Sequence, residues 1–135
     1  MYGNPTFHCD GADIRAHCRQ LATVVTITGH LDELNVEEAT RYVHRFTLTE
    51  KPVGLDLGDG ESFDSAALSL LFTLDDLCGV AGVEWALVAS RAVVQTLGEA
   101  GIDYEAAGSV PEALNHFADA MVARRQLLPL LTKSA

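Results

Sequence analysis

Short apolar segments with the alternation of β-strands recur along this chain, and segments with helical spacing separate them. The clearest strands are Val24–Thr28, Val53–Leu57 and Val83–Val88. Because strands that alternate with helices form largely parallel sheets with right-handed crossovers, we predict a single α/β domain with a mostly parallel central sheet. An earlier strand, Ile14–Cys18, is joined to Val24–Thr28 by a short connection, which predicts an N-terminal antiparallel edge strand.

About four helices are predicted from polar residues that can cap a first turn: Asn35 with Glu38, Asp64, Ser90, and Ser109 with Glu112. Glycines mark the ends of the second and third helices, at Gly82 and Gly101. A short strand is expected at Tyr104–Ala107, whereas residues 1–10 show the pattern of no element. The predicted order is therefore β-β-α-β-α-β-α-β-α.

The chain's 135 residues fit one domain, and an apolar content of 48% is enough for one core. We expect an N-terminal extension over 1–11, the domain over 12–122 and a small apolar tail over 123–135. No segment approaches the ~20 apolar residues of a membrane span, and no leader precedes a cleavage site, so a cytoplasmic location is expected. Three cysteines, an odd count, argue against a secreted disulfide framework. A redox role for Cys9 and Cys18 stays open.

Acidic residues outnumber basic ones by 19 to 9, which gives a net charge of −10. Such a surface repels phosphate backbones and anionic membranes, so neither nucleic acid nor a membrane is an expected partner. The charge is compatible with a basic protein partner reached by electrostatic steering, although solubility alone explains most of it.

The segment 53–68 combines a buried strand, an acidic turn and Asp64-Ser65 at the start of a helix. Asp64 is well placed as an N-cap whose carboxylate accepts a backbone N–H. Ser65 then lies in the first turn, where free N–H groups and the helix dipole favour negative charge. A phosphate on this serine would change the local charge without unfolding the helix. Taken alone, a serine at this position is more often a plain helix-start residue.

This segment resembles the phosphorylatable serine loop of STAS domains, the fold of bacterial anti-sigma factor antagonists. The resemblance rests on four segments in order: Val24-Val-Thr-Ile-Thr-Gly-His-Leu-Asp32; Asp56-Leu57-Gly58 with Asp64-Ser65-Ala66-Ala67-Leu68; Trp85 to Ile102; and Ser109-Val-Pro-Glu-Ala-Leu114. Two departures from the family pattern are present. Ala66 and Ala67 replace a serine and a glycine, and the turn carries Gly60 and Ser62 where apolar residues are usual.

The resemblance implies a non-enzymatic regulatory module that binds an anti-sigma factor, often itself a serine kinase, and so frees a sigma factor for transcription. It implies phosphorylation of Ser65 by that kinase and reversal by a phosphatase. Because the chain carries no cofactor fingerprint and no metal-ligand spacing, no cofactor or metal is expected. The implied partner surface comprises Asp32, Asp64, Ser65, Ala66 and Leu68. Asp32 could also cap the first helix. Asp56 is either a structural carboxylate that bonds loop amides, which we favour, or part of an acidic phosphate-transfer site. A monomer or weak dimer is expected.

Other chemistries have weaker support. Clustered aspartates could bind Mg²⁺ as in a receiver domain, but no acidic pair follows the first parallel strand and no lysine follows a late one. Gly54, Gly58 and Gly60 form no nucleotide-binding fingerprint, and the His8-Cys9 and His17-Cys18 pairs match no zinc spacing. The histidines belong to no nucleophile motif. The main alternative is a STAS-type sensor that binds a small ligand, or acts within a larger signalling complex, without phosphorylation.

Overall fold

The structure is a computed structural model that describes residues 6–19, 21–49, 51–103 and 106–119. Its strands are β1 (Phe7–Cys9), β2 (Ala12–Cys18), β3 (Thr23–Leu31), β4 (Val53–Leu57), β5 (Gly60–Phe63), β6 (Trp85–Ala89) and β7 (Ala106–Ala107). Its helices are α1 (Val36–Thr47), the 3₁₀ turn η1 (Ser65–Ala67), α2 (Leu68–Ala81), α3 (Arg91–Glu99) and a last helix over residues 110–119. The predicted apolar tail over 123–135 lies outside the described residues.

One mixed sheet has the strand order β1-β2-β3-β4-β6-β7, with β5 paired to β3 outside that path. The pairs β1–β2 and β2–β3 are antiparallel, and the pairs that involve β4, β5, β6 and β7 are parallel. The α/β prediction is therefore confirmed, including the antiparallel hairpin at the N-terminal edge.

Strand β1 lies in the stretch that we predicted to form no element. It is only three residues long, and it turns back to β2 through Asp10 and Gly11, which have positive φ values of 36° and 96°. The ring of Phe7 stacks on that of Tyr42 in α1, with centroids 4.5 Å apart. The prediction failed because this strand depends on pairing with β2 and on an aromatic contact with α1, and neither leaves a local pattern in three residues.

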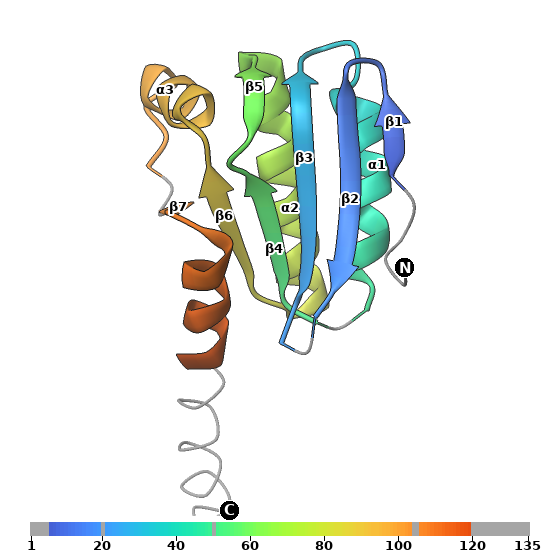
Figure 1. Ribbon diagram of the computed structural model, residues 1–135, viewed down its shortest axis with the longest axis vertical. Coiled ribbons are helices and arrows are strands. Elements are labelled where there is room, and N and C mark those ends of the chain that lie inside the picture. Colours follow the sequence, from blue (N-terminus) through green and yellow to red (C-terminus); the bar gives the residue numbers. More distant parts are fainter. Residues whose placement is uncertain (1–5, 20, 50, 104–105, 120–135) are drawn as a thin grey trace, which may run out of the picture.

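Helices α1 and α2 lie side by side on one face of the sheet (Figure 1). The alternation of β4 sends Val53, Leu55 and Leu57 into the layer between the sheet and these helices, where all three are buried. The helices contribute buried side chains to the same layer, among them Val43, Leu70, Leu71 and Leu74. This core holds α2, and therefore its N-terminal end, against the sheet.

Strand β3 has two parallel partners, and this feature positions the site. Its first residues, Thr23 to Thr26, pair with β4, and its last residues, Gly29 to Leu31, pair with β5, with a register shift between Gly29 and His30. The segment that we predicted as a plain acidic turn therefore contains a short strand. Gly60, Glu61 and Ser62 give no alternation of apolar residues, so β5 could not be recognised from its own sequence.

Two of the predicted helix caps are local hydrogen bonds in the structure. Ser90 Oγ accepts from Val93 N at 3.3 Å and begins α3. Ser109 Oγ accepts from Glu112 N at 3.3 Å at the start of the last helix, while the Glu112 carboxylate accepts from Gly108 N at 2.7 Å. The second cap is thus a capping box displaced by one residue, since its glutamate bonds the N–H that precedes the serine.

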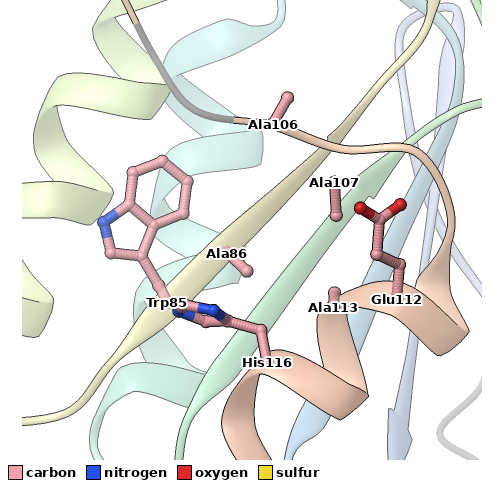
Figure 2. A pocket seen from close by; sticks show the side chains of 7 residues that line it. All are labelled: Trp85, Ala86, Ala106, Ala107, Glu112, Ala113 and His116. Atoms are coloured by element: carbon pink, nitrogen blue, oxygen red, sulfur yellow. The ribbon is translucent and has the colours of Figure 1, made fainter. Parts of the chain in front are cut away.

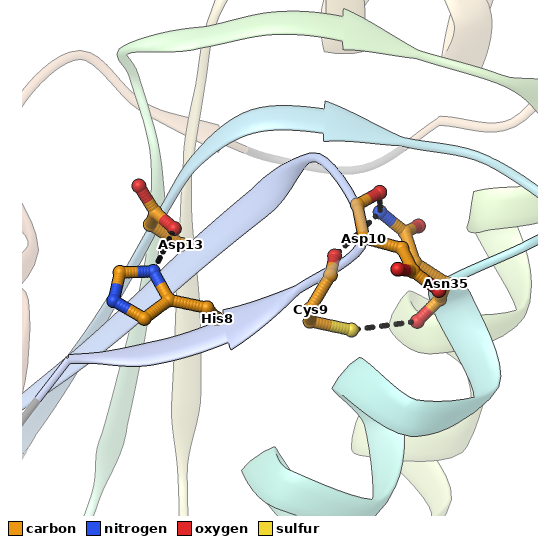
Figure 3. Close-up of polar contacts among 5 residues, drawn as sticks. All are labelled: His8, Cys9, Asp10, Asp13 and Asn35. Atoms are coloured by element: carbon orange, nitrogen blue, oxygen red, sulfur yellow. Dashed lines mark hydrogen bonds and ion pairs between the residues drawn. The ribbon is translucent and has the colours of Figure 1, made fainter.

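The predicted capping pair of Asn35 and Glu38 is wrong. The Asn35 side chain makes no cap hydrogen bond to α1 and is fully buried. Its Oδ1 accepts from Asp32 N at 3.0 Å, and its Nδ2 donates to the carbonyl oxygens of His30, Cys9 and Asp10 at 2.7, 3.1 and 3.0 Å. Figure 3 shows the amide nitrogen facing the turn between β1 and β2. The buried carbonyls compete for this side chain more strongly than the helix terminus does.

The cysteines do not form a redox pair. Cys9 is paired with Ala12 near one end of β2, whereas Cys18 is paired with Thr23 at the other end, so the length of the strand, ~20 Å, separates them. All three cysteines are free. Burial, followed by the nearby Glu38 carboxylate, raises the pKa of Cys9 from 9.0 to about 11, and burial followed by Asp75 raises the pKa of Cys78 to about 11.

We predict that the three thiols differ sharply in reactivity. At pH 8 an aromatic disulfide reagent should modify one thiol per folded chain quickly, that of exposed Cys18, and all three after denaturation. Cys9 and Cys78 are 2% and 1% exposed, and their raised pKa values keep them protonated. Cys18→Ser should abolish the fast reaction, and a second fast thiol would contradict this burial.

The same pKa shifts set the sign of a pH effect on stability. A thiol with a higher pKa in the folded chain binds its proton more tightly there than in the unfolded chain. The stability contributed by Cys9 and Cys78 is therefore present below pH 9.0 and is lost as the pH rises from 9.0 towards about 11.

The Asn35 network predicts a large effect on stability. Asn35→Ala should lower the free energy of unfolding by about 3 kcal/mol, because it leaves buried carbonyl groups and one N–H without their partner. Asn115→Ala, at an exposed position of the last helix, is the control and should change it by less than about 0.5 kcal/mol. Urea denaturation measures both. A loss below about 1 kcal/mol for Asn35→Ala would show that the network contributes little.

Candidate functional site

The site lies where β3 and β5 end side by side. Leu31 pairs with Phe63 in the parallel register, and Asp64 N donates to Leu31 O at 2.9 Å. The residues that follow the two strands, Asp32 and Asp64-Ser65, are therefore at the same edge of the sheet. Loops after the carboxyl ends of parallel strands are a common place for function in α/β folds.

Asp32 is held by a turn of its own loop. Its carboxylate accepts from Leu34 N at 2.9 Å, and its carbonyl oxygen accepts from Val36 N at 3.0 Å. Asn35 is the residue that directly precedes α1, so Asp32 is not the N-cap that it could have been from sequence. Its backbone N–H is fixed by the buried Asn35 side chain. The half-buried Asp32 thus has a defined position beside the second loop.

Asp64 is the N-cap that we predicted. Its carboxylate accepts from Ala66 N at 3.0 Å and from Ser65 Oγ at 3.2 Å, and its backbone is extended, with φ −75° and ψ 157°. Asp64 and Ser65 are both exposed. The helix begins as the 3₁₀ turn η1 and continues as α2, which ends at Gly82 in the left-handed conformation. The Ser65 hydroxyl is accessible at the start of this continuous helical segment.

The other predicted site residues divide into surface and core. Ala66 is half-buried, and Ala67 is fully buried against the core. Leu68 is 6% exposed and belongs to the hydrophobic core, so it offers little of its side chain to a partner. We assigned it to the partner surface because it belongs to the motif, but α2 turns this position inward.

Asp56 is in the geometry of a structural carboxylate. One of its oxygens accepts from Gly58 N at 3.0 Å, and the other accepts from Thr26 Oγ1 at 3.4 Å. The first bond closes the turn that leads from β4 to β5, and the second joins β4 to β3. The bond from Gly58 N is of the kind that the structural interpretation of Asp56 expects, and the role of this residue stays a prediction.

His30 is a site residue that sequence reasoning missed. Its Nδ1 is 2.7 Å from Ser62 Oγ, and its Nε2 is 3.1 Å from a Glu61 carboxylate oxygen. These contacts follow from the pairing of His30 with Ser62 across β3 and β5. The sequence signal was the Gly-His-Leu-Asp order that ends β3, but its meaning depended on β5, which was not predicted.

A separate cavity opens at the edge of the sheet between β6, β7 and the last helix (Figure 2). Its volume is ≈ 310 Å³. Four alanines form much of its lining, together with Trp85, Glu112 and His116. The size is at the lower end of the range for small-molecule sites. None of the residues around Ser65 lines this cavity.

Within the described part of the chain, no helix has the length and apolar character needed to cross a membrane. In the same residues, no three or more histidine, cysteine or acidic side chains gather as a metal site would require. His8, one of the residues considered for zinc, instead contacts the carboxylate of Asp13 at 2.6 Å.

The family model of the STAS domain matches residues 13–117 of this chain. The chain is 48% identical to Osmosensory protein A of Mycobacterium tuberculosis. The alignment is 140 residues long with its gaps, and it covers 98% of this chain and 89% of that protein. An anti-sigma factor antagonist from Mycobacterium paratuberculosis has a TM-score of 0.73 at 17% identity, covering 81% of this chain and 96% of that one.

A second solved structure, a serine-to-glutamate variant of RsbS from Moorella thermoacetica, has a TM-score of 0.66 at 22% identity and covers 82% of this chain and 97% of that one. At these identities the two structures show a shared fold, and they include an anti-sigma factor antagonist. The fold therefore agrees with the motif order found in the sequence. Since the matched region spans most of the sheet and its helices, this chain belongs to the STAS domain family.

Proposed function

We propose that this protein is an anti-sigma factor antagonist in the cytoplasm of a bacterium. It binds an anti-sigma factor through the surface around Ser65 and thereby regulates transcription that depends on a sigma factor. The observation that carries this proposal is the convergence of Asp32 and Asp64-Ser65 at one exposed edge, fixed by the bond from Asp64 N to Leu31 O. The comparisons support it, because a structure with this fold is an anti-sigma factor antagonist.

Phosphorylation of Ser65 is the proposed switch. A phosphate adds about −1.5 to −2 charges at pH 7, here beside the carboxylates of Asp64 and Asp32. The start of a helix tolerates this charge, so the domain stays folded. A partner that fits the unmodified loop would then meet like-charge repulsion and an uncompensated desolvation cost. The partner or another kinase adds the phosphate, and a phosphatase removes it.

The departures at Ala66 and Ala67 are compatible with this switch. Ala66 supplies the N–H that Asp64 caps, which any residue except proline could do. Ala67 is fully buried, where a small apolar side chain fits the core. The proposed partner surface therefore keeps Asp32, Asp64, Ser65 and Ala66. Leu68 packs in the core beneath this surface. In this role the chain is a binding module rather than an enzyme and needs no cofactor.

A ligand-sensing function is the second candidate, and the cavity at Trp85 favours it. A relative that is 48% identical is named Osmosensory protein A, which suits a sensor. Trp85 is the chain's one tryptophan and lines the cavity, so its fluorescence reports on occupancy. A saturable fluorescence change with a small solute, lost in His116→Ala, would support this function.

The test of the switch uses the intact protein as bait in its native cytoplasm, with mass spectrometry of the captured proteins and of Ser65. Calorimetric titration then compares the wild type with two variants. Ser65→Ala should bind within about twofold of wild type, because one exposed hydroxyl contributes little. Ser65→Glu should bind at least about tenfold more weakly, a loss of ~1.4 kcal/mol. Asn115→Glu adds the same charge on the last helix and should leave the affinity unchanged.

Equal affinities for the wild type, Ser65→Ala and Ser65→Glu, with no phosphate on Ser65 in cells, would leave this serine as a helix-start residue. The ligand-sensing function would then be the better account of the domain.

A further inference from the structure

A groove between α1 and the first turns of α2 lies directly beside the Ser65 loop. Its volume is ≈ 380 Å³. Besides Val36, its lining includes four small side chains, here called its floor: Thr40 from α1, Ala66 from η1, and Ser69 and Thr73 from α2. Ala66 also belongs to the cap at Ser65, so the groove continues the proposed partner surface.

Two of the three hydroxyl groups on this floor, those of Thr40 and Ser69, are already engaged. Thr40 Oγ1 donates to Val36 O at 2.7 Å, and Ser69 Oγ donates to Ala66 O at 3.0 Å, each within its own helical segment. Because these two donors need no outside acceptor, an apolar group can cover Thr40 and Ser69 without leaving either hydroxyl proton unpaired. The floor thus suits an apolar side chain, with the threonine methyl groups and Ala66 as its contacts.

The rim of the groove is acidic. Glu33 and Glu37 are exposed on the α1 side, where Arg41 is the cationic lining residue, and the chain as a whole carries −10. Two large apolar side chains are also exposed near this surface. Leu34, in the loop before α1, is 79% exposed, and Phe72, one turn beyond Ser69, is 46% exposed. This combination fits a partner with basic residues around an apolar anchor.

We infer that the groove receives a bulky apolar side chain from a basic segment of the partner protein, whose lysine or arginine residues contact Glu33 and Glu37. This inference rests on the proposed function, because it extends the same surface along α1 and α2. A second copy of this chain is a poor occupant, since two surfaces of the same negative sign repel each other.

The groove also explains why one phosphate would have a wide effect. Ser69 follows Ser65 by one helical turn, a rise of roughly 6 Å, which is within a Debye length of ~8 Å at physiological salt. A phosphate at Ser65 would thus act on groups bound at the near end of the groove as well as at the loop.

The test measures the affinity of the intact protein for the protein captured with it, using two groove variants of different kinds. Thr73→Trp fills the floor, and the double variant Glu33→Lys/Glu37→Lys reverses the rim charge at two exposed positions. Asp103→Lys, at an exposed position outside the groove, is the charge-matched control. Circular dichroism checks that each variant is folded. The rim variant is at exposed positions, so it tests the inference even if Thr73→Trp fails to fold.

We expect each folded groove variant to bind at least about tenfold more weakly, and Asp103→Lys to bind within about twofold of wild type. The rim variant should also lose most of the wild type's salt dependence. A photo-crosslinker at position 73 should join the groove to a basic peptide of the partner.

Wild-type affinity in the groove variants would overturn the inference, whatever Ser65→Glu does. If Ser65→Glu weakens binding and the groove variants do not, the proposed function stands without the groove. If the groove variants weaken binding and Ser65→Glu does not, the groove stands and the switch fails. Crosslinks only to a second copy of the chain, or to no protein, would also overturn the inference.

Discussion

The division of β3 between two parallel partners sets the arrangement of the sheet and of the Ser65 loop. The first part of β3 pairs with β4, and its carboxyl-terminal part pairs with β5. The chain must therefore step from the end of β4 to the end of β3 within a few residues. Asp56 closes the turn that makes this step. As a result, the helix that starts at Ser65 begins beside Asp32.

A second constraint, the buried Asn35 side chain, fixes the other half of the site. It bonds the backbone of Asp32 and also the carbonyl groups of the turn between β1 and β2. The N-terminal strand and the Asp32 loop are thereby joined through one side chain. Because both loops are held by backbone hydrogen bonds, a charge added at Ser65 would act on a preformed surface. Repulsion of the partner then requires no large rearrangement of this domain.

The exposed charges of this molecule contribute differently to folding stability and to partner binding. Individual exposed ion pairs contribute ~1 kcal/mol or less, so the acidic side chains around Ser65 do little for the fold. Once a partner excludes water from the same surface, these charges determine which partners fit and how fast they associate. The cavity at Trp85 lies between β6, β7 and the last helix and has lining residues of its own. The two surfaces are therefore separable by substitution.

Features that depend on neighbouring residues could be predicted from the sequence alone. The alternation of Val53, Leu55 and Leu57 predicted β4, and the polar residues Asp64 and Ser90 predicted helix caps, because a cap bonds an N–H two or three residues away. Four local segments in order gave the resemblance to the family, and the one around Asp64 placed Ser65 at a helix start.

Features that depend on distant segments became visible only in the folded chain. Strands β1 and β5 exist because β2 and β3 pair with them, and three or four residues carry too little pattern to show this. The Asn35 side chain does not cap α1, because it donates instead to carbonyl groups 25 and 26 residues earlier in the chain. Leu68 belongs to the motif, but helix packing turned it into the core. The physical reason is common to all three cases: long-range pairing and burial satisfy groups that a local sequence pattern does not bring together.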